Sequence, residues 1–113
     1  MSHERRRSPR VAILGRVHGH VATLDVKVTV RDMSLGGLSM ETAFAFPVGA
    51  VHEFRLLLGD GASVELRGRV VHSSEATTPA GGRVYVTGVQ FIDDDAADGA
   101  GTVGNFLGRI TDA

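Results

Sequence analysis

Apolar and polar residues alternate in several short stretches of this chain, and this period of two constrains the fold more than any other feature. In residues 26–31 three valines alternate with lysine, threonine and arginine, and residues 64–70 follow the same pattern. Such alternation is typical of β-strands that bury one face. We expect strands over residues 11–17, 26–31, 38–41, 51–58, 64–70 and 84–91.

Turn-forming residues separate these stretches. Gly68 interrupts the apolar face of the strand expected over 64–70, where it indicates a bulge or a close approach of another backbone. Many short strands separated by turns predict an all-β chain, folded as a small antiparallel barrel or sandwich. We expect the turns at His18-Gly19-His20, Gly36-Gly37, Gly59-Asp60-Gly61 and residues 77–82.

The composition supports one folded domain and excludes several classes of site. The chain has 113 residues, of which 42% are hydrophobic, enough for a single core. It contains no cysteine, which excludes disulfides, thiolate nucleophiles and zinc sites built on sulfur. Only 5% of the residues are aromatic, so the stacking platforms of single-strand binders are scarce. With neither a secretory signal nor an apolar stretch of membrane-spanning length, we expect a cytoplasmic protein.

The two ends of the chain carry opposite charge, although the formal net charge is only -1. We expect residues 1–10 to form a flexible basic arm, residues 11–95 the barrel, and residues 96–113 a C-terminal segment that can form a helix. Glycines in that last segment lower its helix propensity. The arginines that crowd the beginning are Arg5, Arg6, Arg7, Arg10 and Arg16; acidic residues after the last expected strand are Asp93, Asp94, Asp95 and Asp98.

The sequence offers little that indicates catalysis or a metal. His18 and His20 flank a glycine, which fits an exposed turn better than a metal site. His52 and His72 lie near expected strand ends with no serine or carboxylate partner in the sequence. No nucleophile elbow, P-loop or dinucleotide fingerprint occurs. We therefore expect a non-enzymatic protein without cofactor or metal.

One combination of residues points to a ligand. An arm that Pro9 keeps extended carries Arg6 and Arg10, and guanidinium groups bind phosphate and stack on flat rings. At the end of a strand, the carboxylate of Asp32 can accept two parallel hydrogen bonds such as guanine offers. The hydroxyl of Ser34 and the backbone of Gly36-Gly37 suit a phosphate. Each half also has a simpler interpretation, as a solvated basic tail and as turn-forming residues.

Taken together, these residues resemble the PilZ domain family, which binds the bacterial second messenger cyclic di-GMP. Arg6 and Arg10 match the family's R-x-x-x-R pattern, and Asp32, Ser34 and Gly37 match its D/N-x-S-x-x-G pattern. The strand Tyr85-x-x-Gly88-x-x-Phe91 is also similar to the family. The resemblance implies a small antiparallel β-barrel of about six strands, usually with a C-terminal helix, from which the glycine-rich end departs.

The same resemblance implies roles for individual residues. The two arginines of the pattern would clamp guanine and phosphate, Asp32 would pair with a guanine edge, and Ser34 with Gly36 and Gly37 would line the site. Arg5 and Arg7 add charge that would help hold a second, stacked cyclic di-GMP, since family members bind either one molecule or an intercalated pair.

The function expected from this resemblance is that of a receptor. Its arginine arm would become ordered over cyclic di-GMP, and an unknown protein partner would recognise the changed surface. Two alternatives remain open: an adaptor that keeps the barrel but binds protein, and a small barrel that binds RNA or single-stranded DNA. The scarcity of aromatic residues and the acidic tail oppose the nucleic-acid alternative.

Overall fold

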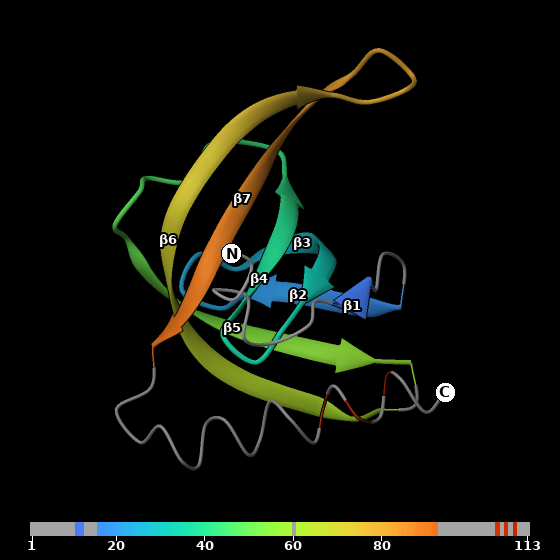
Figure 1. The fold of residues 1–113 in the computed structure, drawn as a ribbon, viewed down its shortest axis with the longest axis vertical. Helices are drawn as coiled ribbons and strands as arrows, with labels where there is room; N and C mark the ends of the chain where they lie inside the picture. Colours follow the sequence, from blue (N-terminus) through green and yellow to red (C-terminus); the bar gives the residue numbers. More distant parts are fainter. Residues whose placement is uncertain are drawn as a thin grey trace, which may run out of the picture.

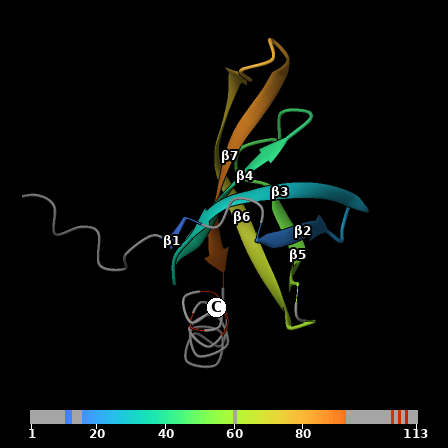
Figure 2. The same cartoon turned by 90° about the vertical axis from the view of Figure 1, so that its right-hand side faces the viewer.

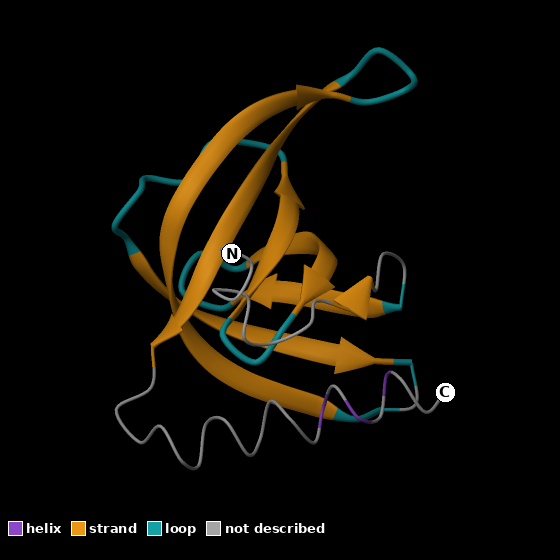
Figure 3. Ribbon diagram, viewed as in Figure 1, coloured by secondary structure: helices purple, strands orange, loops and turns teal. Residues whose placement is uncertain are grey.

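Seven antiparallel strands make up nearly all of the described chain (Figure 1). The computed structural model describes residues 11–12, 16–59 and 61–92, together with Phe106, Gly108 and Ile110. Figure 3 shows how little loop separates the strands. The strands are β1 (Val11–Ala12), β2 (Val17–Val21), β3 (Val26–Met33), β4 (Gly37–Thr42), β5 (Val51–Leu58), β6 (Ser63–Thr77) and β7 (Arg83–Ile92).

Six of these strands close into a barrel, as the alternation predicts. Strand β3 pairs with β2, and the ring continues through β5, β6, β7 and β4 back to β3, every pair being antiparallel. The short β1 pairs with the last residues of β3. It lies along the same edge of β3 that pairs with β2 near the start of that strand. Closure pairs the edges that an open sheet would leave exposed. The predicted all-β barrel of about six strands is confirmed.

The inner face of the barrel holds a single apolar core. On β6 the predicted inward face of Val64, Leu66, Gly68 and Val70 is confirmed, because the residues between them are exposed. Gly68 lies where a Cβ would collide with Val89 and press on the ring of Phe54, so it marks a close approach of side chains. The glycine thus makes room for larger core side chains from neighbouring strands.

One predicted turn is wrong. His18-Gly19-His20 lies inside β2, and the turn after that strand is formed by residues 22–25, where Asp25 has a φ of 56°. Gly19 faces the core, where a Cβ would come within 2.8 Å of a Val28 methyl group. The glycine serves packing between strands. The strand expected over residues 11–17 corresponds to β1 and the first residue of β2, while residues 13–15 lie outside the described residues.

Strands β6 and β7 form the longest pair and extend past the rest of the sheet as a two-stranded ribbon (Figures 1 and 2). Their pairing runs from Arg67 opposite Ile92 to Thr77 opposite Arg83. Strand β4 accompanies β7 only as far as Tyr85. An ion pair between Arg83 and Glu75, 2.8 Å long, lies on the projecting ribbon.

Two of the described residues near the C-terminus, Phe106 and Ile110, pack against the barrel. Phe106, Gly108 and Ile110 have helical backbone, and Phe106 and Ile110 belong to the core cluster. The guanidinium of Arg16 donates a hydrogen bond of 2.7 Å to the carbonyl of Ile110. The rest of the helix expected within 96–113 lies outside the described residues, as do Asp93, Asp94, Asp95 and Asp98. No helix in the part of the chain described here has the length and apolar character needed to cross a bilayer.

Candidate functional site

A β-bulge in β3 places Asp32 on the outer surface of the barrel. The register between β3 and β4 shifts after Val30, which pairs with Met40, so that Asp32 pairs with Ser39. Val30 and Met33 are both fully buried, although residues three positions apart lie on opposite faces of a regular strand. The bulge absorbs the extra residue, and Asp32 and Ser39 share the outer face as partly exposed neighbours. Strict alternation would have turned the carboxylate into the core.

The turn between β3 and β4 is tight and internally hydrogen-bonded. The backbone N–H of Ser34 donates to the carbonyl of Gly37 over 2.8 Å. The hydroxyl oxygen of Ser34 accepts a hydrogen bond of 3.2 Å from the N–H of Gly36. Ser34, only 6% exposed, is therefore a turn former, as the simpler interpretation expects.

Gly36 and Gly37 have different structural roles. Neither glycine has a positive φ angle, which among the described glycines occurs at Gly49, Gly61 and Gly81. At Gly37 a Cβ would collide with the carbonyl oxygen of Val89 on β7. At Gly36 a Cβ would meet nothing within 4 Å, and its carbonyl accepts a hydrogen bond from the N–H of Phe91. The turn is thus held closely against β7.

The chain leading into the barrel runs beside this turn. Ala12 pairs with Asp32, and Val11 pairs with Met33. Val11 follows Arg10 directly in the sequence, so the last residue of the predicted arm is covalently joined to a residue that lies against the end of β3. Arg5, Arg6, Arg7 and Arg10 lie outside the described residues. Of the predicted site, the structure therefore brings together Asp32, Ser34, Gly36, Gly37 and the point where the arm enters the barrel.

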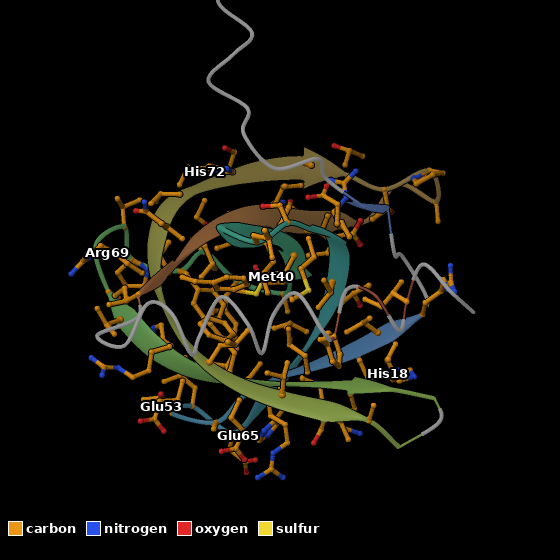
Figure 4. All side chains as sticks on the ribbon, turned by 60° about the horizontal axis from the view of Figure 1, so that its bottom comes forward. His18, Met40, Glu53, Glu65, Arg69 and His72 are labelled. Atoms are coloured by element: carbon orange, nitrogen blue, oxygen red, sulfur yellow. The ribbon has the colours of Figure 1, made fainter. Side chains whose placement is uncertain are left out.

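Three further outer-face residues, Ser39, Gly88 and His72, lie in line with Asp32 and were not predicted as part of the site. Ser39 pairs with Gly88 on β7, and Gly88 pairs with His72 on β6. Figure 4 shows His72 and Arg69 on the outside of β6. The sequence signal that pointed to this region was the family-like glycine at position 88, whose partner could be identified only from strand register.

The other polar clusters of the described chain do not form a competing site. Among the described residues no group of three or more histidine, aspartate or glutamate side chains could hold a metal. His20 contacts Asp25 over 2.9 Å on the surface. His52 is 8% exposed and packs edge-on between Phe46 and Phe54 in the core. The outer face around Asp32 is therefore the best candidate for ligand binding.

Comparison with known proteins bears on the family and the fold of the chain. The family model described as PilZ domain matches residues 4–108. No curated protein shows a significant sequence match to this chain. The structure of K. pneumonia MrkH in complex with c-di-GMP superposes with a TM-score of 0.73 at 17% identity, covering 95% of this chain and 53% of MrkH. The PilZ domain of YcgR from Escherichia coli with c-di-GMP gives 0.66 at 15% identity, covering 95% and 94%.

The structural matches show the fold of the chain. A MrkH structure in its apo state superposes with a TM-score of 0.71 at 15% identity, so the likeness extends to a relative without ligand. This chain spans about half the length of MrkH.

Proposed function

Because the chain belongs to the PilZ domain family, we propose that it is a receptor for cyclic di-GMP and acts without catalysis. The observation that carries the proposal is the pairing of Ala12 with Asp32, which brings the entry of the arginine arm next to the D-x-S-x-x-G turn. Arg10 and Asp32 are 22 positions apart in the sequence, and this pairing allows the two motifs to bind one ligand. The c-di-GMP bound to MrkH and to YcgR supports this ligand for a barrel of the same fold.

The reach of the arm fits this arrangement. An extended chain spans at most about 3.5 Å per residue, so Arg6 lies no more than roughly 18 Å of backbone from Val11. Arg10 is adjacent to Val11. A ligand on the outer face at Asp32 is thus within range of both guanidinium groups, and neither arginine needs to leave the neighbourhood of β1. The guanidinium groups would bind phosphate and stack on guanine.

The carboxylate of Asp32 would supply base recognition. It can accept two parallel hydrogen bonds from N1–H and N2–H of guanine, which adenine does not present in that arrangement. The bulge in β3 turns this half-buried carboxylate away from the core and toward the outer face. Asp32 therefore would select the base, whereas the arginines would supply most of the attraction to the two phosphates.

The response to the ligand would be an ordering of the arm. An arm rich in arginine has little apolar surface to bury and gains its contacts when the anionic messenger binds. A downstream protein in the cytoplasm would then recognise the changed surface. Arg5 and Arg7 would favour an intercalated pair of messengers, because they double the positive charge beside the clamp.

Calorimetric titration with cyclic di-GMP tests the proposal. We expect nanomolar-to-micromolar affinity for the wild-type chain, roughly −8 to −12 kcal/mol. Arg6→Ala or Arg10→Ala should each weaken binding by about 2 kcal/mol or more, a factor of roughly 30. Arg83→Ala is the matched control, because Arg83 lies on the projecting ribbon and pairs with Glu75. Absence of binding by the wild-type chain would refute the proposal.

Base selection is tested by competition in the same assay. Asp32→Ala should reduce the preference for cyclic di-GMP over cyclic di-AMP, because only the guanine edge uses the carboxylate. The stoichiometry of the wild-type titration distinguishes one messenger from two. Binding of single-stranded RNA that falls steeply with salt would favour the polynucleotide alternative instead.

A further inference from the structure

Gly88 lies on the outer face of β7 and is nevertheless buried. Residues on that face of a small barrel ordinarily meet solvent, since only the inner face contributes to the core. The neighbours of Gly88 along the outer face are half-buried Val86 and exposed Gln90. Something on the outer surface therefore covers Gly88, and the barrel core does not explain it.

The cover is the imidazole of His72. Gly88 pairs with His72, and a Cβ at position 88 would collide with Nε2 and Cδ2 and lie 3.0 Å from Cε1 of that ring. Nε2 and Cε1 form the end of the ring remote from the His72 backbone, and Cδ2 lies on the ring edge that leads to it. The ring therefore extends from β6 across to β7, and its tip lies over the Gly88 backbone. The side chain itself remains exposed to solvent.

A second β-bulge directs His72 to this place. The register between β6 and β7 shifts after Val70, which is fully buried opposite Val89. His72 then takes the outer position opposite Gly88, and Ser73 faces Thr87 with a hydroxyl–hydroxyl distance of 2.9 Å. Bulges often re-aim a side chain beside a functional site. In this barrel one bulge presents Asp32, and the other presents His72.

Among the described residues, the outer-face positions between these two side chains carry only small groups. Gly88 pairs with Ser39, and Ser39 pairs with Asp32, so two strand spacings separate Gly88 from Asp32. Neighbouring strands lie about 4.8 Å apart, which puts the imidazole tip roughly 10 Å from the Asp32 backbone. The intervening outer-face positions carry one hydroxymethyl group and one hydrogen atom. A flat ligand can lie directly on this strip of sheet.

We propose that His72 forms the far wall of the cyclic di-GMP site and makes an aromatic contact with the guanine whose edge pairs with Asp32. This inference rests on the proposed function and adds a residue to which neither motif points. Imidazole rings stack on nucleobases, and an imidazole N–H can donate to guanine acceptors or to phosphate oxygen. Gly88 is the residue that allows the ring to reach the base.

A purely structural role for His72 makes different predictions from a binding role. A ring that only covers Gly88 would affect unfolding and leave affinity unchanged. The test therefore measures both, by calorimetric titration with cyclic di-GMP and by urea unfolding of each full-length variant. The variants are His72→Ala, His72→Phe, Gly88→Ala and the double variant His72→Ala with Gly88→Ala. Ser74→Ala is the matched control, because Ser74 is the next exposed residue on the same face of β6.

We expect His72→Ala to weaken cyclic di-GMP binding about tenfold, as for loss of one base–aromatic contact. His72→Phe keeps a flat ring and should retain affinity within about threefold. Gly88→Ala displaces the imidazole, so it should also weaken binding. In the His72→Ala background it should add little, because the ring it displaces is already absent.

The outcomes separate this inference from the proposed function. Wild-type binding that His72→Ala leaves within twofold of its original affinity would overturn the role of His72 and leave the receptor intact. Loss of affinity in Ser74→Ala as large as in His72→Ala would also overturn it. A wild-type chain that does not bind cyclic di-GMP would overturn the proposed function, and this inference with it.

Discussion

Gly37→Ala tests how the site turn is attached to the barrel. A Cβ at this position would collide with the carbonyl oxygen of Val89, an atom of the β7 backbone that no rotamer change can move. The collision can be relieved only if β4 and β7 separate at their first paired residues, Gly37 with Gln90 and Leu38 with Val89. The substitution therefore affects the site and the barrel at once.

The size of the effect follows from the packing. Overpacking a close-packed position costs about 1–3 kcal/mol, and each weakened backbone hydrogen bond adds about 1 kcal/mol. We expect a loss of about 3 kcal/mol in the free energy of unfolding. For a domain of this size the loss corresponds to a fall in Tm of roughly 10–20 °C.

Urea unfolding followed by circular dichroism measures this loss, and Gly36→Ala provides the matched control. At Gly36 a Cβ would meet nothing within 4 Å, and the φ angle is not positive. Its substitution should change the free energy of unfolding by less than about 0.5 kcal/mol, or stabilise slightly by restricting the unfolded chain. Equal stability of Gly37→Ala and the wild-type chain would show that the turn is not pressed against β7 as described.

Two further substitutions test the barrel itself. His52→Leu should raise the free energy of unfolding by about 1 kcal/mol, because both ring nitrogens of His52 are buried without a hydrogen-bond partner in the described chain; a loss of stability measured by urea unfolding would contradict this. Arg16→Ala should lower it by about 1 kcal/mol through loss of the bond to the Ile110 carbonyl. The control, Arg55→Ala, removes only an exposed ion pair with Glu65 and should cost less than about 0.5 kcal/mol; equal effects of the two arginine substitutions would refute the tie to the C-terminal residues.

Much of the barrel was predictable from local patterns. The alternation of valines with polar residues in β3 and β6 depends only on which face is buried, and the predicted faces agree with the structure. The turn expected between β5 and β6 was also found, because the N–H of Gly61 donates to the carbonyl of Leu58 and Gly61 has a φ of 96°. These features are determined by residues close together in the sequence.

The prediction was wrong or incomplete where distant residues decide. Gly19 is typical of a turn when considered alone, but methyl groups of Val28 and Val30 on β3 determine its role. The two bulges cannot be located from alternation, because a run such as Val70-Val71 is compatible with either register. His72 was consequently assigned to a strand end, although β6 continues to Thr77.

For the site, the sequence was informative about chemistry and uninformative about placement. Asp32, Ser34 and Gly37 could be selected as a motif, and the structure shows which part each plays in the turn. Their proximity to the arm depends on the pairing of β1 with β3. This pairing joins Ala12 and Asp32, which are 20 positions apart in the sequence. No local pattern specifies that pairing.

A structure of the full 113-residue chain with cyclic di-GMP would test the central claim most directly. We predict that the messenger lies on the outer face of β3, β4 and β7, with a guanine edge at Asp32 and with Arg6 and Arg10 on the same ligand. A messenger bound elsewhere on the barrel, or one that contacts the turn while both arginines point away, would contradict the account.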